Sequence, residues 1–292
     1  MKDLLLIDTN AVFCRSRSAL TRTMGEMVTS AGIPVTGTYG TLNTIFSIID
    51  KGEYDSIIPC YDAGGNFRKK LNDEYKGTRE KSSVEHYADM SLLVEDVLPT
   101  LGFNPVGVKG WEADDLIATI SRNSPAYREV HILTVDTDLL QLVGNRVKVI
   151  LFNSVKKTKT YGIDDVVEKY GVYPSEIKYL KSLCGDTSDN VAGIKGIGPK
   201  TAVKIIEECR PNEINPEFTG ADKICLHAKV ASNAATFLGN LRLITLENDV
   251  PDLKWFASSR PIAMHVEALF QGLEFKSLLK RKGKILQTLG CS

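Results

Sequence analysis

A run of acidic, glycine and small polar residues between positions 185 and 202 offers the strongest candidates for chemistry in this chain. The stretch Gly185-Asp186-Thr187-Ser188-Asp189-Asn190 places two carboxylates three residues apart, and carboxylate oxygens are common ligands of divalent cations. Two residues later, Gly193-Ile194-Lys195-Gly196-Ile197-Gly198-Pro199-Lys200-Thr201-Ala202 predicts a glycine-rich hairpin that opens a helix. Backbone N–H groups at Gly196 and Gly198 can approach a phosphate closely at such a helix N-terminus. The run therefore predicts a metal site beside a phosphate-binding turn.

Further carboxylates lie where predicted strands end and predicted helices begin. Three apolar runs predict parallel strands: residues 4–7 end on Asp8, residues 56–61 run into Asp62, and residues 130–135 run into Asp136. Because the carboxyl ends of parallel strands meet at one edge of a sheet, these three side chains are expected to lie together. The nine acids found in this way are Asp8, Asp62, Glu112, Asp114, Asp115, Asp136, Asp138, Asp186 and Asp189.

Each acidic segment also has an interpretation without a metal. The 112–115 segment opens a predicted helix, where carboxylates suit the helix dipole, and the 136–138 segment suits a turn or an N-cap. Asp186 and Asp189 would face the same way if their segment were helical. Gathered in one place, however, the carboxylates would repel one another, by roughly 1 kcal/mol for a pair about 4 Å apart in water and by several times more in a cleft. Cations are therefore expected among them, and oxygen-only ligands favour Mg²⁺ or Mn²⁺, with some acids binding through water.

The pattern of strands and helices predicts an α/β fold with a parallel central sheet and flanking helices over residues 1–160. Helices are predicted between the strands at 39–49, 92–101 and 112–120. After residue 160 the pattern turns helical, with helices predicted at 163–170, 174–183, 199–209, 223–246 and 261–280. Residues 211–220, rich in Pro, Asn and Glu, predict a loop. The chain therefore divides into an α/β region, 1–160, and a helical region, 161–292.

Composition excludes several classes of protein. The chain of 292 residues is 43% hydrophobic and 25% charged, as in ordinary globular proteins. It contains no apolar run near the roughly 20 residues of a membrane span, and the apolar N-terminal stretch is too short for a signal peptide. A cytoplasmic protein without a membrane partner is expected. Six cysteines without a C-x-x-C pair predict buried free thiols, and four isolated histidines argue against a zinc site.

Formal net charge is zero, which conceals uneven distribution along the chain. Residues 67–70, 75–79 and 276–284 are locally basic. An acidic metal site with basic surroundings can sum to zero and still bind phosphate strongly.

In their order along the chain, these motifs resemble those of the 5′-nuclease superfamily. That superfamily includes the 5′-to-3′ exonuclease domain of bacterial DNA polymerase I, the phage 5′-exonucleases and the flap endonucleases. The matching blocks are Leu5-Leu6-Ile7-Asp8, Tyr61-Asp62, Phe67-Arg68, Glu74-Tyr75-Lys76-Gly77-Thr78-Arg79, Glu112-Ala113-Asp114-Asp115, Leu133-Thr134-Val135-Asp136-Thr137-Asp138-Leu139, the 185–202 run and Leu273-Glu274-Phe275-Lys276-Ser277-Leu278-Leu279. The resemblance covers nearly the whole chain. One departure is Thr9, where the family commonly has Gly; it removes no ligand, so activity is expected to survive.

The resemblance implies a PIN-like core, a helical arch at about 66–95 and a helix–three-turn–helix at about 182–208. It also implies a two-metal site. One metal would lie among Asp8, Asp62, Glu112, Asp114 and Asp136, and the other among Asp138, Asp186 and Asp189, with Asp115 in support. The implied activity is a structure-specific 5′-to-3′ exonuclease and 5′-flap endonuclease that leaves a 5′-phosphate and a 3′-hydroxyl. Its partner would be double-stranded DNA with 5′ ends or flaps, bound by a monomer during replication or repair.

Roles for individual residues follow from the same resemblance. Asp8 and Asp62 would act in catalysis as metal ligands, while Lys76 and Arg79 would neutralise charge on the scissile phosphate. Tyr75 would stack on an unpaired base. The expected DNA contacts, including the hairpin that grips the duplex backbone, are Arg68, Lys69, Lys70, Tyr75, Lys195, Gly196, Gly198, Lys200 and Thr201. A K⁺ ion held by hairpin carbonyls is a further expectation.

Three alternatives remain open from the sequence. The same site would serve RNase H-like removal of RNA primers from RNA–DNA hybrids. A toxin-like RNase with an acidic sheet is disfavoured, because such small domains lack the Gly196-Ile197-Gly198 hairpin and the helical half. A non-catalytic protein that binds branched DNA is disfavoured as well, because none of the expected acids is missing.

Overall fold

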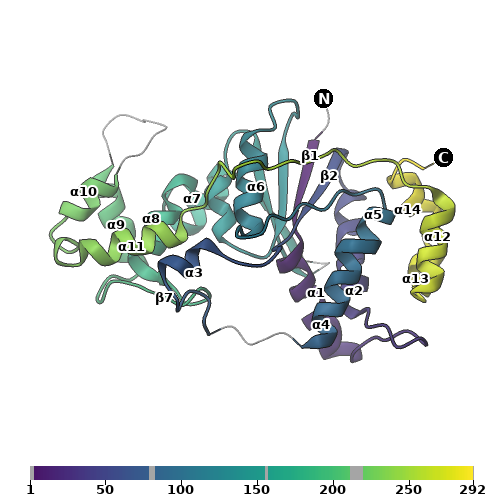
Figure 1. Cartoon of the computed structure of the whole chain (residues 1–292). Coiled ribbons are helices and arrows are strands. Elements are labelled where there is room, and N and C mark those ends of the chain that lie inside the picture. Colours follow the sequence, from purple (N-terminus) through teal and green to yellow (C-terminus); the bar gives the residue numbers. More distant parts are fainter. Residues whose placement is uncertain (1–2, 79–82, 155–156, 211–219, 292) are drawn as a thin grey trace.

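A five-stranded sheet forms the centre of the molecule (Figure 1). The computed structural model describes residues 3–78, 83–154, 157–210 and 220–291. The strand order is β2-β1-β3-β4-β5, and the bounds are β1 Asp3–Asp8, β2 Tyr54–Cys60, β3 Val130–Thr134, β4 Val147–Ser154 and β5 Lys157–Tyr161. All neighbouring strands are parallel except β5, which runs antiparallel to β4. The parallel sheet predicted from three apolar runs is confirmed, and β4 and β5 extend it.

Successive residues of β1 feed two separate cores, because side chains alternate between the faces of a strand. Leu4 and Leu6 pack on the face covered by α6 (Ala113–Arg122) and the helical region. Leu5 and Ile7 pack on the face covered by α1 (Thr9–Met24) and α2 (Thr36–Ile49). The sheet is therefore buried on both faces, which explains why its strands read as continuous apolar runs.

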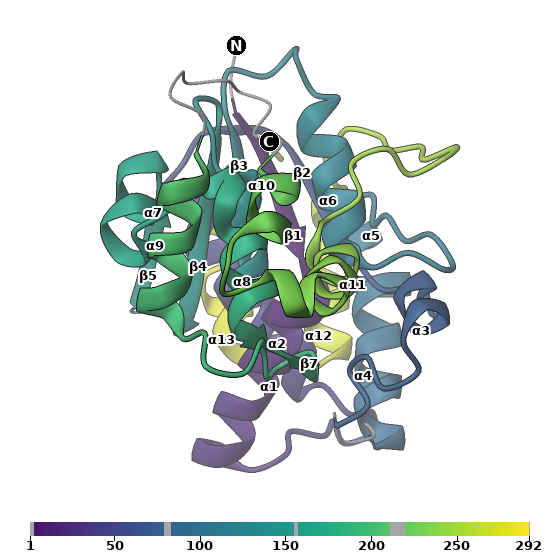
Figure 2. The same cartoon turned by 90° about the vertical axis from the view of Figure 1, so that its left-hand side faces the viewer.

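The helical region lies at one side of the sheet, drawn in green in Figure 1 and facing the viewer in Figure 2. Its elements are α7 (Ile163–Tyr170), η3 (Pro174–Glu176), α8 (Ile177–Cys184), α9 (Pro199–Cys209), α10 (Ala221–Leu226), η4 (Ala231–Asn233) and α11 (Ala234–Ile244). The predicted helices at 163–170 and 199–209 match α7 and α9. The prediction of one helix over 223–246 is wrong, because α10 ends before η4 and α11 begins only at Ala234. The predicted loop at 211–220 lies almost entirely outside the described residues.

The last three helices return to the α/β core instead of joining the helical region. After α11, residues 245–262 run back past the edge strand β2, where Ser258 N donates to Ser56 Oγ over 2.9 Å. Helices α12 (Ala263–Gly272), α13 (Lys276–Lys280) and α14 (Lys282–Thr288) follow. They pack on the α2 side of the sheet, and the Phe270 and Phe46 rings lie 6.4 Å apart. No helix among the described residues is long and apolar enough to cross a membrane.

The remaining elements are short. Helices α3 (Phe67–Leu71), α4 (Val84–Leu92), η1 (Leu93–Val97) and α5 (Leu98–Thr100) follow β2, and η2 (Asp138–Leu142) follows β3. After α8, the strands β6 (Gly185–Asp186) and β7 (Val191–Ala192) form a hairpin. The segment from Asp186 to Asp189 is not helical, so the helical interpretation of their spacing does not apply. Positive φ angles of 83° at Gly185 and 58° at Asn190 turn the chain back sharply at this point.

Candidate active-site cleft

A cleft of about 990 Å³ opens beyond the carboxyl ends of β1, β2 and β3. Five of the predicted acids line it: Asp8, Asp62, Glu112, Asp114 and Asp136. Polar residues of α1 and of the first turn of α4 line it as well: Asn10, Cys14, Arg15, Ser18, Arg22, His86 and Tyr87. The cleft therefore contains a carboxylate cluster and two arginines.

Asp8 owes its position to two adjoining elements. It is the last residue of β1 and the N-cap of α1, and its carboxylate accepts hydrogen bonds from Ala11 N over 3.1 Å and from Thr134 Oγ1 over 2.7 Å. Thr134 in turn accepts from Asp136 N over 2.9 Å, which links Asp8 and Asp136 through one hydroxyl. Burial, together with the charges of Asp62 and Asp136, raises the pKa of Asp8 to about 7 despite these hydrogen bonds.

The first turn of α6 supplies the next acids, as the sequence predicted. Glu112 is its N-cap, and Asp62 Oδ1 accepts from Ala113 N over 2.7 Å, which places the loop after β2 against this helix. Burial, followed by the charges of Asp8 and Asp136, raises the pKa of Asp114 well above its usual range. Burial and mutual repulsion make these carboxylates costly to ionise, and an oxygen-only donor set fits a divalent cation such as Mg²⁺ or Mn²⁺.

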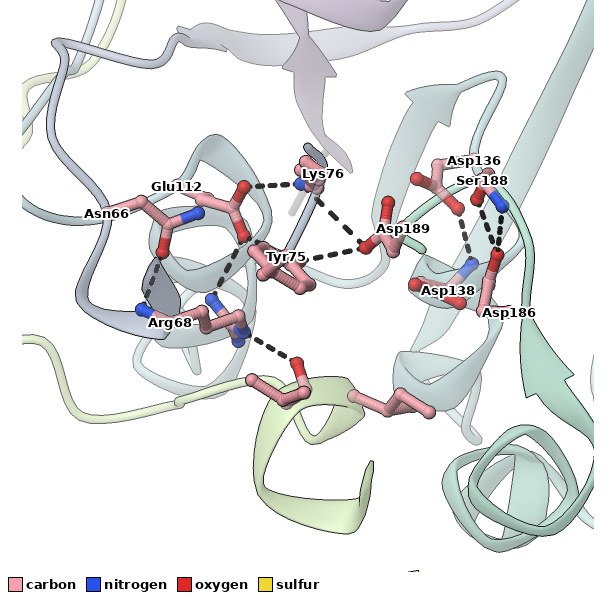
Figure 3. Close-up of polar contacts among 12 residues, drawn as sticks. Asn66, Arg68, Tyr75, Lys76, Glu112, Asp136, Asp138, Asp186, Ser188 and Asp189 are labelled. Carbon is pink, nitrogen blue, oxygen red and sulfur yellow. Dashed lines mark hydrogen bonds and ion pairs between the residues drawn. The ribbon is translucent and has the colours of Figure 1, made fainter. Parts of the chain in front are cut away.

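Lys76 lines the cleft and lies between Glu112 and Asp189 of the β6–β7 hairpin (Figure 3). Its ammonium pairs with the Glu112 carboxylate, and its Nζ lies 3.9 Å from Asp189 Oδ2. Its backbone N–H donates to Asp189 O over 2.9 Å. Burial disfavours the charged ammonium, but Glu112 and Asp189 outweigh this effect and raise the pKa of Lys76. A lysine is therefore held, fully charged, beside the carboxylates.

A second acidic group surrounds Lys181 of α8. The Lys181 ammonium pairs with Asp138 and lies 2.8 Å from Asp186 Oδ2. Asp138 N donates to Asp136 Oδ1 over 2.8 Å, which connects this group to the first. Burial and the charge of Asp136 raise the pKa of Asp138 to about 7. Sequence reasoning missed Lys181, although a lysine five residues before Asp186 on a predicted helix was a usable signal.

The nine predicted acids do not converge on one point. Among the described residues, no three of the nine predicted acids bring one oxygen each within 4.8 Å of one another. The group that does so is Asp3, Glu129 and His131, at the opposite, amino end of the sheet. That group already has partners, because Arg128 donates to Asp3 over 3.0 and 2.9 Å and His131 Nδ1 lies 3.0 Å from Tyr54 Oη.

Two of the predicted DNA contacts have side chains that are buried within the protein. Arg68 is 1% exposed and Tyr75 is 3% exposed. Arg68 binds the Asp115 carboxylate, which is itself buried and turned away from the cleft lining. The Tyr75 hydroxyl donates to Glu112 over 3.1 Å and to Asp189 over 2.8 Å.

The remaining predicted DNA contacts lie at the surface. Lys69 and Lys70 on α3 are exposed. The glycine-rich turn that follows β7 is also exposed at Lys195, Gly196, Gly198 and Lys200, and Thr201 beside it is half-buried. Arg79 falls outside the described residues. Their contact with DNA stays a prediction, as does the helix–three-turn–helix at about 182–208.

The arginines of α1 were also missed. Arg15, Ser18 and Arg22 follow one another at spacings of three and four residues, which puts them on one face of a helix. The mixed polar and apolar sequence of 9–24 gave no clear helical period, so the sequence reasoning did not identify the helix or its basic face.

Fold and site together define a class of protein: a parallel α/β sheet with a carboxylate cleft suited to divalent metal ions, joined to a helical region. Comparison with known proteins narrows the class. A family model described as the 5′-3′ exonuclease N-terminal resolvase-like domain matches residues 3–171, and one described as the 5′-3′ exonuclease C-terminal SAM fold matches residues 172–260. This chain belongs to the 5′-3′ exonuclease family, a family of metal-dependent phosphodiester hydrolases.

Individual relatives agree with the family match. A 5′-3′ exonuclease of Aquifex aeolicus is 31% identical over 98% of this chain and 97% of its own length. DNA polymerase I of Caldicellulosiruptor bescii is 31% identical over 96% of this chain, which spans about a third (33%) of that polymerase. The bacteriophage T5 5′-exonuclease, solved with zinc, has the same fold, with a TM-score of 0.67 and 20% identity over 99% of this chain and 100% of its own.

Proposed function

We propose that this chain hydrolyses DNA phosphodiesters as a structure-specific 5′-to-3′ exonuclease and 5′-flap endonuclease. The observation that supports the proposal most directly is a single cleft lined by five acids and by Arg15 and Arg22. The T5 protein supports the choice of substrate, because one of its structures is described as a flap endonuclease in a complex with DNA and metal ions.

The acids would hold two divalent ions, Mg²⁺ by preference and Mn²⁺ in its place. Asp8, Asp62, Glu112, Asp114 and Asp136 would serve one ion, and Asp138, Asp186 and Asp189 the other, directly or through water. When bound, such a pair lowers the pKa of a water and stabilises the attacking and leaving oxygens. Raised pKa values at Asp8, Asp114 and Asp138 support a need for cations here.

The basic groups of the chain would bind and orient the strand. Lys76, which lines the cleft beside Glu112, would balance charge that develops on the scissile phosphate. Arg79, three residues later in the sequence, would have the same role. Arg15 and Arg22 would contact phosphates of the unpaired 5′ strand in the cleft. The glycine-rich turn from Lys195 to Thr201 would hold the duplex backbone, and its carbonyls are candidates for K⁺.

A ribonucleotide 5′ strand in an RNA–DNA hybrid is a second candidate substrate, because hydrolysis of its phosphodiesters would use the same metal-binding acids. A monomeric state, a cytoplasmic location and a role in replication or repair rest on the sequence and the relatives, and stay proposals.

The proposed function is tested by cleavage of an end-labelled 5′-flap duplex in Mg²⁺. A DNA 5′ strand and an RNA 5′ strand are compared in the same duplex. Cutting near the junction between single strand and duplex, with a 5′-phosphate on the product, is expected for the DNA strand. Faster cutting of the RNA strand would favour primer removal. Junction binding without Mg²⁺-dependent cutting would replace the nuclease with a non-catalytic binding protein.

A further inference from the structure

Arg68 makes an unusually complete set of contacts for a buried side chain. Its guanidinium donates to Asp115 Oδ2 over 2.7 Å, Asp115 Oδ1 over 2.8 Å and Glu112 Oε2 over 3.1 Å. It also donates to two backbone carbonyls, Leu243 O over 2.7 Å and Thr245 O over 2.9 Å. An arginine has five N–H donors, and all five are used here. The side chain is 1% exposed, so none of them can reach DNA in this structure.

The two carbonyls lie at the C-terminus of α11, which ends at Ile244. The last carbonyls of a helix lack partners within the helix and carry partial negative charge, so a guanidinium both satisfies and stabilises them. Asp115 completes the junction from its other side, because its Oδ1 also accepts from Glu247 N over 2.9 Å. Arg68 and Asp115 therefore fasten the end of α11 to the first turn of α6.

Helix α11 in turn supports the acidic hairpin. The Asn240 amide donates to Ser182 O over 3.0 Å and to Ala192 O over 2.8 Å, so α11 binds both α8 and β7. Glu112, at the start of α6, shares its Oε2 between Arg68 and the Tyr75 hydroxyl, as Figure 3 shows. A single guanidinium thus contacts a cleft carboxylate and also the helix that carries the hairpin.

We propose that Arg68 is a positioning residue that fixes the Glu112 carboxylate and the hairpin acids relative to each other. It acts without touching the substrate, and the proposal rests on the nuclease function proposed above. Its fork geometry matters as well as its charge, because a lysine has three donors at one point and cannot replace the five hydrogen bonds to Asp115, Glu112 and the two carbonyls.

The test uses Arg68→Lys and, from the other partner, Asp115→Asn, beside Ile120→Val as a control. Ile120 is a fully buried residue at the far end of α6, so the control loses packing in the same helix without touching the junction. We expect kcat on the 5′-flap duplex to fall at least tenfold in both junction variants, with KM and its salt dependence changed less than threefold. Ile120→Val should lower the melting temperature and leave kcat within twofold of the unchanged protein.

Hydrogen exchange of the metal-free proteins gives a readout that does not depend on activity. Amides in residues 243–250 are expected to exchange at least tenfold faster in Arg68→Lys and Asp115→Asn, and at the unchanged rate in Ile120→Val. This arm tests the junction even if the unchanged protein fails to cleave a flap, which would refute the proposed function instead.

Two results would overturn the proposal. Weaker DNA binding with unchanged kcat would make Arg68 a DNA contact after all. A fall in kcat no larger than that of Ile120→Val at equal loss of melting temperature would reduce the junction to general stability. If Arg68→Lys does not fold, Asp115→Asn and its exchange rates decide between these outcomes.

Discussion

The Thr134 hydroxyl on β3 donates a hydrogen bond of 2.7 Å to the Asp8 carboxylate at the end of β1. The same oxygen accepts from Asp136 N over 2.9 Å, so one buried side chain orients two neighbouring acids of the cleft. Groups that orient metal ligands commonly affect both metal affinity and activity.

Thr134→Val keeps the volume of this side chain and removes both hydrogen bonds. We expect kcat to fall about 10- to 100-fold, the range typical of groups that orient metal ligands. The free energy of unfolding should fall by about 1–3 kcal/mol, because buried partners are left unsatisfied. Thr119→Val is the matched control, since its buried hydroxyl accepts only from Val250 N among the hydrogen bonds found for the described residues and forms none with Asp8 or Asp136. Equal kcat losses in the two variants would contradict the orienting role.

Lys76→Ala removes the ammonium that pairs with the Glu112 carboxylate in the cleft. We expect kcat to fall about 100-fold, since removal of one charge-stabilising group costs about that much in other enzymes. KM should change much less. Steady-state kinetics at several salt concentrations separate the outcomes: an altered salt slope with normal kcat would make Lys76 a distant phosphate contact.

Arg15→Ala tests the basic face of α1. If Arg15 binds one phosphate of the unpaired strand, the affinity should drop evenly across flap sequences, and the salt slope of log K should fall by about 1. Lys51→Ala is the control, because Lys51 lies in the turn before β2, at the amino end of the sheet. Filter binding in EDTA measures both. Identical slopes for Arg15→Ala and the unchanged protein would remove α1 from the DNA path.

Metal-free protein should respond to pH through the cleft acids. The pKa of Asp8 is raised to about 7 from the ordinary 3.8, mainly by burial. A carboxyl whose pKa is higher in the folded chain stabilises the fold at low pH, and that contribution is lost as pH rises through about 7.

Asp8→Asn keeps a helix cap but cannot ionise. In EDTA, the melting temperature of Asp8→Asn relative to the unchanged protein should therefore increase between pH 5 and pH 8. Added Mg²⁺ at pH 8 should stabilise the unchanged protein more than the variant. A difference that stays flat with pH would show that the Asp8 carboxyl is not destabilised by its surroundings.

The sheet and the first turn of α6 were predictable because their signals are local. An unbroken apolar run such as Leu4 to Ile7 marks a strand buried on both faces, and the acidic 112–115 segment marks a helix start. The acids that follow the strands were predictable for the same reason, since strand direction alone places them at one edge.

What the sequence hid depends on contacts between distant residues. Arg68 and Thr245 are 177 residues apart, and no local pattern reveals that a basic residue in a Phe-Arg-Lys-Lys run is buried under α11. Asp186 and Asp189 looked like a helical pair because spacing alone cannot show the turn made by Gly185 and Asn190. The basic face of α1 went unseen because the helix itself lacks a clear apolar stripe.

The proposed metal-dependent nuclease site at the strand ends is tested most directly by cleavage of an end-labelled 5′-flap duplex. The unchanged protein and Asp136→Asn are compared, each with Mg²⁺ and with EDTA. Asp96→Asn, an exposed aspartate on η1 away from the cleft, serves as the control. We expect Mg²⁺-dependent cutting near the junction by the unchanged protein and by the control, and a cleavage rate lower by several orders of magnitude in Asp136→Asn. Cutting that persists in Asp136→Asn or in EDTA would contradict a metal-dependent site at the ends of these strands.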